Sequence, residues 1–117
     1  MNIAEWYERA AQEWPPRDLA FKAALRRGAQ ELLTRGYGRA SRAFADASRL
    51  AEGDDRELAR GLVHLAAAGH RLKAGEADSA TRQLAHARRR LAPALGRTDP
   101  VDVASLVAAV ERDPGPR

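Results

Sequence analysis

The sequence predicts an all-α protein, an antiparallel bundle of five to six helices. Alanine, leucine and arginine dominate the 117 residues and aromatic residues make up only 5%, a balance that favours helices. Apolar residues recur at three- and four-residue spacing along most of the chain, as they do on the buried side of a helix. Short stretches rich in Gly, Pro and Asp separate these runs, so consecutive helices should pack antiparallel.

The first three helices are predicted over residues 3–13, 16–35 and 37–51. Asn2 can cap the first helix, and Trp14-Pro15-Pro16 ends it because a residue before proline is disfavoured in the α region. Gly36 ends the second helix. Their inward stripes are Ile3, Trp6, Tyr7 and Ala10 in the first, Phe21, Leu25, Ala29 and Leu32 in the second, and Ala40, Phe44, Ala47 and Leu50 or Ala51 in the third.

The next helix, Glu57 to Gly75, is predicted to be the buried centre of the bundle. Asp54 or Asp55 can cap it. A helix that is apolar on more than one side is normally enclosed by others, and its many small residues let those neighbours approach closely. Its two apolar sides are Leu58, Leu62, Leu65, Gly69 and Leu72 on one, and Val63, Ala66, Ala67 and His70 on the other.

A fifth helix is predicted over residues 76–95, with Pro93 ending or kinking it. A short last helix follows, capped by Thr98 or Asp99 and with Pro100 in its first turn. Residues 1–112 then form one domain, and residues 113–117 form a disordered tail. The inward stripes are Ala80, Leu84, Ala87 and Leu91 in the fifth helix and Val103, Leu106, Val107 and Val110 in the last.

A weak internal repeat is also present. The spacing of Ala40, Phe44 and Ala47 is repeated by Ala80, Leu84 and Ala87, and a glycine precedes each copy, at positions 36 and 75. The spacing resembles that of tetratricopeptide-like helical repeats. The alternative is that any closely packed helical bundle alternates small and large residues in this way.

Composition excludes several classes of protein. The sequence has no cysteine, so it has no disulfide, thiolate metal site or catalytic thiol, and a reducing compartment suits it. No apolar run approaches the length of a membrane span, and the N-terminus lacks the basic and apolar regions of a secretion signal. We therefore expect a cytoplasmic protein with no membrane partner.

No catalytic motif is present. The serines at positions 41, 48, 79 and 105 lack the Gly-x-Ser-x-Gly elbow, and no Gly-rich loop with Lys and Ser or Thr could cradle phosphates. We therefore expect no enzyme activity, cofactor, catalytic residue or resident metal. The leading hypothesis is a non-catalytic interaction or scaffold module.

Two surfaces could serve such a module. Trp6, Tyr7 and Trp14 form an early aromatic cluster that could be a partner surface or a homodimer contact, although a helical lid over the bundle is the alternative. A basic stripe on the fifth helix, within residues 76–95, could bind a polyanion such as a nucleic acid, although a solvated outer face would look the same. The stripe consists of Arg82, His86, Arg89 and Arg90.

The segment from Arg56 to Leu91, RELARGLVHLAAAGHRLKAGEADSATRQLAHARRRL, resembles the domain of unknown function 309 family of bacteria and archaea. Members of that family have a Gly-Leu-Ile-Gln lead-in, a run of small residues, a histidine, a glycine and a second helix with Ala and Leu. The matching residues are Gly61, Leu62, Val63, Ala66, Ala67, His70, Gly75, Ala80, Leu84, Ala87 and Leu91. The resemblance implies no activity.

The chain departs from the family in the preceding block, where members have an aromatic residue followed by Glu-Ala-His-Glu and a further Glu and Trp. Here Tyr37 is followed by Arg39-Ala40-Ser41-Arg42, so the carboxylates and the histidine that could bind a metal or move a proton are missing. Tyr37, Ser41 and His70 remain as a candidate metal or ligand pocket. The alternative for His70 is a core histidine hydrogen-bonded to a neighbour.

Overall fold

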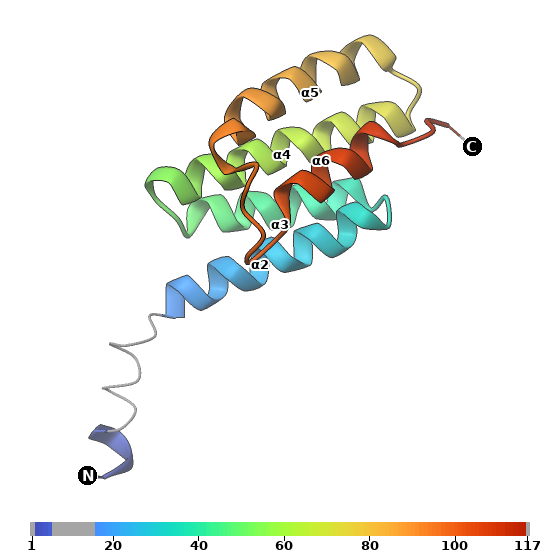
Figure 1. The fold of residues 1–117 in the computed structure, drawn as a ribbon. Coiled ribbons are helices and arrows are strands. Elements are labelled where there is room, and N and C mark those ends of the chain that lie inside the picture. The colour runs from blue at the N-terminus through green and yellow to red at the C-terminus, as the bar shows by residue number, and fades with distance from the viewer. Residues whose placement is uncertain (1, 6–15, 117) are drawn as a thin grey trace.

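A computed structural model describes residues 2–5 and 16–116. Every regular element in these residues is helical, which confirms the predicted all-α fold (Figure 1). Asn2 Oδ1 accepts a hydrogen bond of 2.8 Å from Glu5 N–H, as expected of the predicted cap, and the rest of the predicted first helix lies outside the described residues. The elements are α2 (Pro16–Leu33), α3 (Tyr37–Arg49), α4 (Gly53–Lys73), α5 (Ala77–Leu91), the 3-10 turn η1 (Ala92–Ala94) and α6 (Val103–Glu111).

Two antiparallel hairpins, α2–α3 and α4–α5, form the bundle, and α3 packs beside α4 (Figure 1). The short connections between these four helices dictate that arrangement. The last helix differs from the predicted pairing of consecutive helices. After the longer connection of residues 95–102, α6 packs mainly against α2 and α4 (Figure 1), and Glu111 at its end pairs with Arg88 of α5 at 3.2 Å.

Helix α4 is the buried centre, as predicted. Leu62 and Leu65 are completely buried, because α3, α5 and α6 all contact this helix. The small residues permit the close approach. A Cβ atom added at Gly61 would lie 2.7 Å from Leu91 Cδ2 on α5.

Ile3 of the predicted first helix is 75% exposed, so its predicted inward placement is wrong. The predicted apolar stripes of α2, α3, α5 and α6 face inward, and only Ala29, Leu50 and Leu84 among these residues are partly rather than fully buried. Helix α5 ends at Leu91, before Pro93, as expected. Helix α6 starts later than predicted, because Asp102 and not Thr98 or Asp99 caps it, with Asp102 Oδ1 accepting a 3.2 Å bond from Ser105 N–H.

The two hairpins have matching helix ends. Arg35, after α2, and Gly75, after α4, both adopt left-handed backbone angles, with φ of 63° and 80°. The residue after each donates its N–H to a carbonyl of the helix, Gly36 to Glu31 at 2.7 Å and Glu76 to Arg71 at 2.8 Å. This Schellman pattern normally has glycine at the left-handed position, and the first hairpin has arginine instead.

The prediction of a disordered tail is wrong for residues 113–116. Asp113 has a side chain that is only 1% exposed, and Gly115 is buried. Hydrogen bonds from the end of α2 and the start of α3 hold this segment against the bundle. Residue 117 lies outside the described residues.

Among the described residues, no helix is both long and apolar enough to span a lipid bilayer.

Candidate anion-binding site

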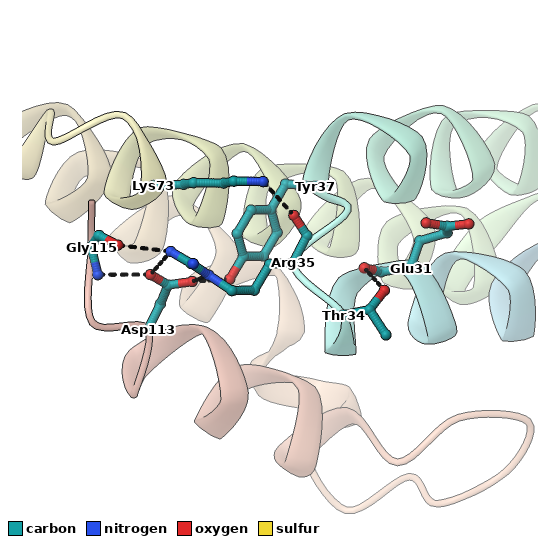
Figure 2. Close-up of polar contacts among 7 residues, drawn as sticks. All are labelled: Glu31, Thr34, Arg35, Tyr37, Lys73, Asp113 and Gly115. Atoms are coloured by element: carbon teal, nitrogen blue, oxygen red, sulfur yellow. Dashed lines mark hydrogen bonds and ion pairs between the residues drawn. The ribbon is translucent and has the colours of Figure 1, made fainter. Parts of the chain in front are cut away.

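The C-terminal segment is joined to the bundle by a cluster of four residues, Arg35, Tyr37, Asp113 and Gly115, which we term the C-terminal clasp (Figure 2). Arg35 donates from Nε and Nη2 to the two carboxylate oxygens of Asp113, at 2.9 and 3.0 Å. Arg35 Nη2 also donates to the carbonyl of Gly115 at 2.8 Å, and Gly115 N–H donates to Asp113 at 2.8 Å. The Tyr37 hydroxyl donates a further bond to the same carboxylate.

The clasp changes the acidity of its members. Burial by itself would raise the pKa of Asp113, but hydrogen bonds from Arg35, Tyr37 and Gly115 stabilise the carboxylate and lower its pKa to about 2. Burial, together with the hydrogen bond to Asp113, raises the pKa of Tyr37 to about 12. The hydrogen bond to Asp113 also raises the pKa of Arg35. At neutral pH the clasp is therefore an ion pair with a neutral tyrosine.

Tyr37 owes its place to a glycine on the neighbouring helix. Its ring is buried against Gly69 of α4, where an added Cβ atom would overlap ring carbons. Because α3 and α4 are antiparallel, the start of α3 meets the end of α4 at this point. The clasp therefore lies where α2, α3, α4 and the C-terminal segment meet.

A basic cavity of about 280 Å³ lies beside the clasp. Three parts of the chain contribute cationic or titratable side chains to its wall: the end of α2, the first turns of α3 and the last turns of α4. These side chains are Arg35, Arg39, Arg42, His70 and Lys73. The backbone of Gly36 and Gly38 completes the same wall.

Two of these cations lack an acidic partner among the described residues. Arg39 pairs with Glu31 at 2.8 Å, and Arg35 pairs with Asp113. Arg42 has no carboxylate within ion-pair distance in the part of the chain that the structure describes, and Lys73 donates only to the carbonyl of Arg35, at 3.3 Å (Figure 2). The cavity therefore has an excess of positive charge.

The start of α3 adds to this charge. No side chain caps the helix at Gly36, so the first N–H groups of α3 receive no bond from a capping side chain. The helix dipole places partial positive charge at the same end. Anions are stabilised in such a position, in addition to their attraction to the side chains.

The predicted pocket residues are partly brought together. Tyr37 and His70 line the basic cavity, but Ser41 does not. His70 is exposed, so its prediction as a core histidine is wrong. The physical reason is that α4 has one stripe that no other helix covers, on which Ala67 is half-buried and His70 is exposed. No group of three or more His, Asp or Glu side chains within the described ranges is placed to hold a metal ion.

The predicted polyanion stripe is intact but partly neutralised. Its four members are all exposed on α5. Arg90 faces Glu57 of α4 at 3.8 Å, and Arg89 donates to His86 Nδ1 at 3.0 Å. The ring of His86 stacks on that of His64, with centroids 5.6 Å apart. Arg82 and Arg89 are the arginines of the stripe without a carboxylate partner in the described part of the chain.

A larger cavity lies elsewhere, between the start of α4 and the end of α5, and has a volume of about 640 Å³. Acidic residues from α4 face arginines from α5 and the loop after it, as in the pair of Arg90 with Glu57 at 3.8 Å. Its charges are therefore largely balanced within the chain. The smaller cavity beside the clasp has an excess of positive charge and therefore a clearer preference for anions.

Sequence reasoning missed Arg35, Arg39, Arg42, Lys73 and Asp113 as site residues. One signal was available for Arg35, because it stands where the matching helix end has a glycine. Trp6, Tyr7 and Trp14, the predicted partner surface, lie outside the described residues. Comparison of the chain with protein-family models, with curated proteins and with solved structures gave no match.

Proposed function

We propose that this protein is a non-catalytic helical binding module that recognises an anionic group of its ligand or partner in the basic cavity. The observation that carries this proposal is the convergence of cationic side chains from α2, α3 and α4 on one cavity. Two of them, Arg42 and Lys73, have no carboxylate partner among the described residues. An anion would supply the missing negative charge.

The size of the cavity limits the ligand group. A volume of about 280 Å³ lies just below the range of roughly 300–1,000 Å³ for small-molecule sites. It suits one phosphoryl or carboxylate group better than a whole nucleotide. Arginine offers a planar fork of donors that matches the oxygens of both groups.

The acidity of the clasp supports binding rather than catalysis. General acid–base catalysis works best with a pKa near the operating pH. The pKa values of Asp113 and Tyr37 lie at about 2 and about 12, so neither group exchanges a proton readily near neutral pH. The groups beside the cavity are thus suited to hold a ligand in place.

Calorimetric titration with inorganic phosphate at low salt tests the proposal. We expect saturable binding that is lost in the double variant Arg42→Gln, Lys73→Gln. Arg82→Gln on α5 is the control, because it removes an exposed arginine that does not line the cavity, and it should leave binding unchanged. Equal loss in both variants would instead favour the α5 stripe as a polyanion surface.

Self-association is a second candidate, supported by an apolar groove between α2 and α6. The groove has a volume of about 240 Å³, and its apolar walls include Ala29, Leu33, Val101 and Leu106. Leu33 is 58% exposed at its edge. An apolar patch with a polar rim is typical of a protein contact, and a second copy of the chain could cover it.

Membership of the domain of unknown function 309 family also remains a proposal, and it depends on the segment from Arg56 to Leu91. The structure of that segment, with a small-residue helix followed by a second helix, is compatible with it. We further propose a cytoplasmic location, which the absence of cysteine supports.

A further inference from the structure

We infer that the C-terminal segment regulates the basic cavity: the Asp113 carboxylate neutralises Arg35 and so competes with an external anion for it. This inference depends on the proposed anion-binding function. In this role, residues 113–116 compete with an external anion for Arg35, and the charge and position of Asp113 set the affinity of the cavity for that anion.

Arg35 is the residue that both sites share. It lines the cavity, and in the clasp its Nε and Nη2 atoms are occupied by Asp113 and Gly115. None of its hydrogen bonds to the described residues uses Nη1. Nη1 is therefore left to face an anion in the cavity, but the two anions compete for the single positive charge of Arg35, which Asp113 already balances.

The neutralisation of Arg35 by Asp113 affects the net charge of the cavity, because few of its other cations are unpaired. Arg39 is paired with Glu31, so the excess charge comes from Arg42 and Lys73. If Asp113 lost its negative charge or moved away, Arg35 would become a third unbalanced cation in the same wall. The Coulomb attraction of an anion would then rise, because the repelling carboxylate is removed.

The backbone supports a role for the Arg35 side chain beyond ending the helix. Arg35 has a left-handed φ of 63°, and Gly75 fills the matching position in the second hairpin. A residue with a side chain is strained there, whereas glycine is not. The arginine is held in that conformation while its side chain reaches the clasp (Figure 2).

The test is calorimetric titration of the full chain with inorganic phosphate, comparing wild type with Asp113→Asn. The substitution keeps the shape of the side chain and removes its charge. We expect phosphate to bind about three- to tenfold more tightly, the order of magnitude for removing one repelling charge from a partly solvated site. In the Asp113→Asn, Arg35→Gln double variant this gain should disappear.

Glu111→Gln is the control for a general loss of negative charge. It removes a carboxylate at the end of α6 that pairs with Arg88 at 3.2 Å and does not line the cavity. Phosphate affinity should stay within about twofold of wild type, because the charges beside the cavity are unchanged. A gain in Glu111→Gln as large as that in Asp113→Asn would overturn the specific role of the Asp113 carboxylate.

Failure of this inference and failure of the proposed function give different results. If wild type binds phosphate and Asp113→Asn binds it equally or more weakly, the competition is refuted and the anion site stands. If neither protein binds phosphate, both are refuted. If Asp113→Asn binds phosphate and wild type does not, the result would support competition in which Asp113 prevents phosphate binding in wild type.

Discussion

Arg35 and Gly75 occupy the same position in two matching helix ends, 40 residues apart in the sequence, and both have left-handed backbone angles. At Gly75 the conformation costs nothing, but at Arg35 it is strained. Only the first of the two ends has a side chain at this position. The Arg35 side chain holds the C-terminal segment through Asp113 and borders the basic cavity.

The variant Arg35→Gly compares the free-energy cost of the left-handed backbone at this position with the stabilisation from the Arg35–Asp113 ion pair. The glycine should relieve about 1 kcal/mol of left-handed strain. It would also leave the Asp113 carboxylate, which is 1% exposed, without its cation, and removing one partner of a buried ion pair is strongly destabilising. We expect a net loss of stability in urea unfolding.

Adding Asp113→Asn to Arg35→Gly supplies the control for that experiment. The double variant no longer buries an uncompensated charge and should unfold at higher urea than Arg35→Gly alone. If Arg35→Gly is instead more stable than wild type, the clasp contributes less than the strain that it imposes.

Acid should weaken the fold through Asp113. Its pKa is about 2 in the folded protein and about 4 in an unfolded chain. Because the folded value is the lower one, the contribution to stability is present above about pH 4 and is lost as the pH falls toward 2. The loss should be on the order of 2 kcal/mol, measured by urea unfolding between pH 5 and pH 2. Asp113→Asn should lack this component, and an identical acid profile in both proteins would contradict it.

Close packing of α4 against α5 predicts that Gly61→Leu is destabilising. A Cβ atom added at Gly61 would lie 2.7 Å from Leu91 Cδ2 and 3.2 Å from Arg90 Cβ, so a larger side chain must push the helices apart. We expect a cost of about 1–3 kcal/mol in urea unfolding.

Gly38→Ala is the matched control, since no heavy atom lies within 4 Å of the added Cβ and helical alanine is favoured over glycine. It should stabilise by up to about 1 kcal/mol. Equal effects of the two substitutions would mean that the helices around Gly61 pack more loosely than these distances imply.

The apolar groove between α2 and α6 predicts concentration-dependent self-association. Leu33→Asp places a charge at its exposed edge and should hold the protein at a monomer mass near 12.7 kDa in light scattering, whereas wild type should exceed that mass at high concentration. Leu95→Asp is the control, because Leu95 is similarly exposed but does not line the groove. A wild-type monomer at all concentrations would remove this candidate.

The helices could be predicted from the sequence because their signals are local. Leu62 and Leu65 belong to a stripe with helical spacing, and the break before Pro93 has a steric cause within the chain itself. The buried stripe of α6 is also evident from Val103 to Val110, although its packing against α2 and α4 is not. A longer connection permits several placements, and the sequence does not choose among them.

The candidate site could not be predicted in the same way, because it depends on residues that are distant in the chain. Arg35 and Asp113 meet only after four helices have packed, and Asp113 lies in a Pro- and Gly-containing stretch that resembles a disordered end. His70 was misplaced because spacing alone does not show which side of a central helix lacks a neighbour.

The proposed anion binding in the cavity at the start of α3 can be tested residue by residue, by following backbone amide resonances of the ¹⁵N-labelled protein during titration with inorganic phosphate. We expect saturable shifts that are largest for Gly36, Gly38 and Arg42 and small along α5. Shifts that never saturate, or that are largest around Arg82 and Arg89, would contradict an anion site in this cavity.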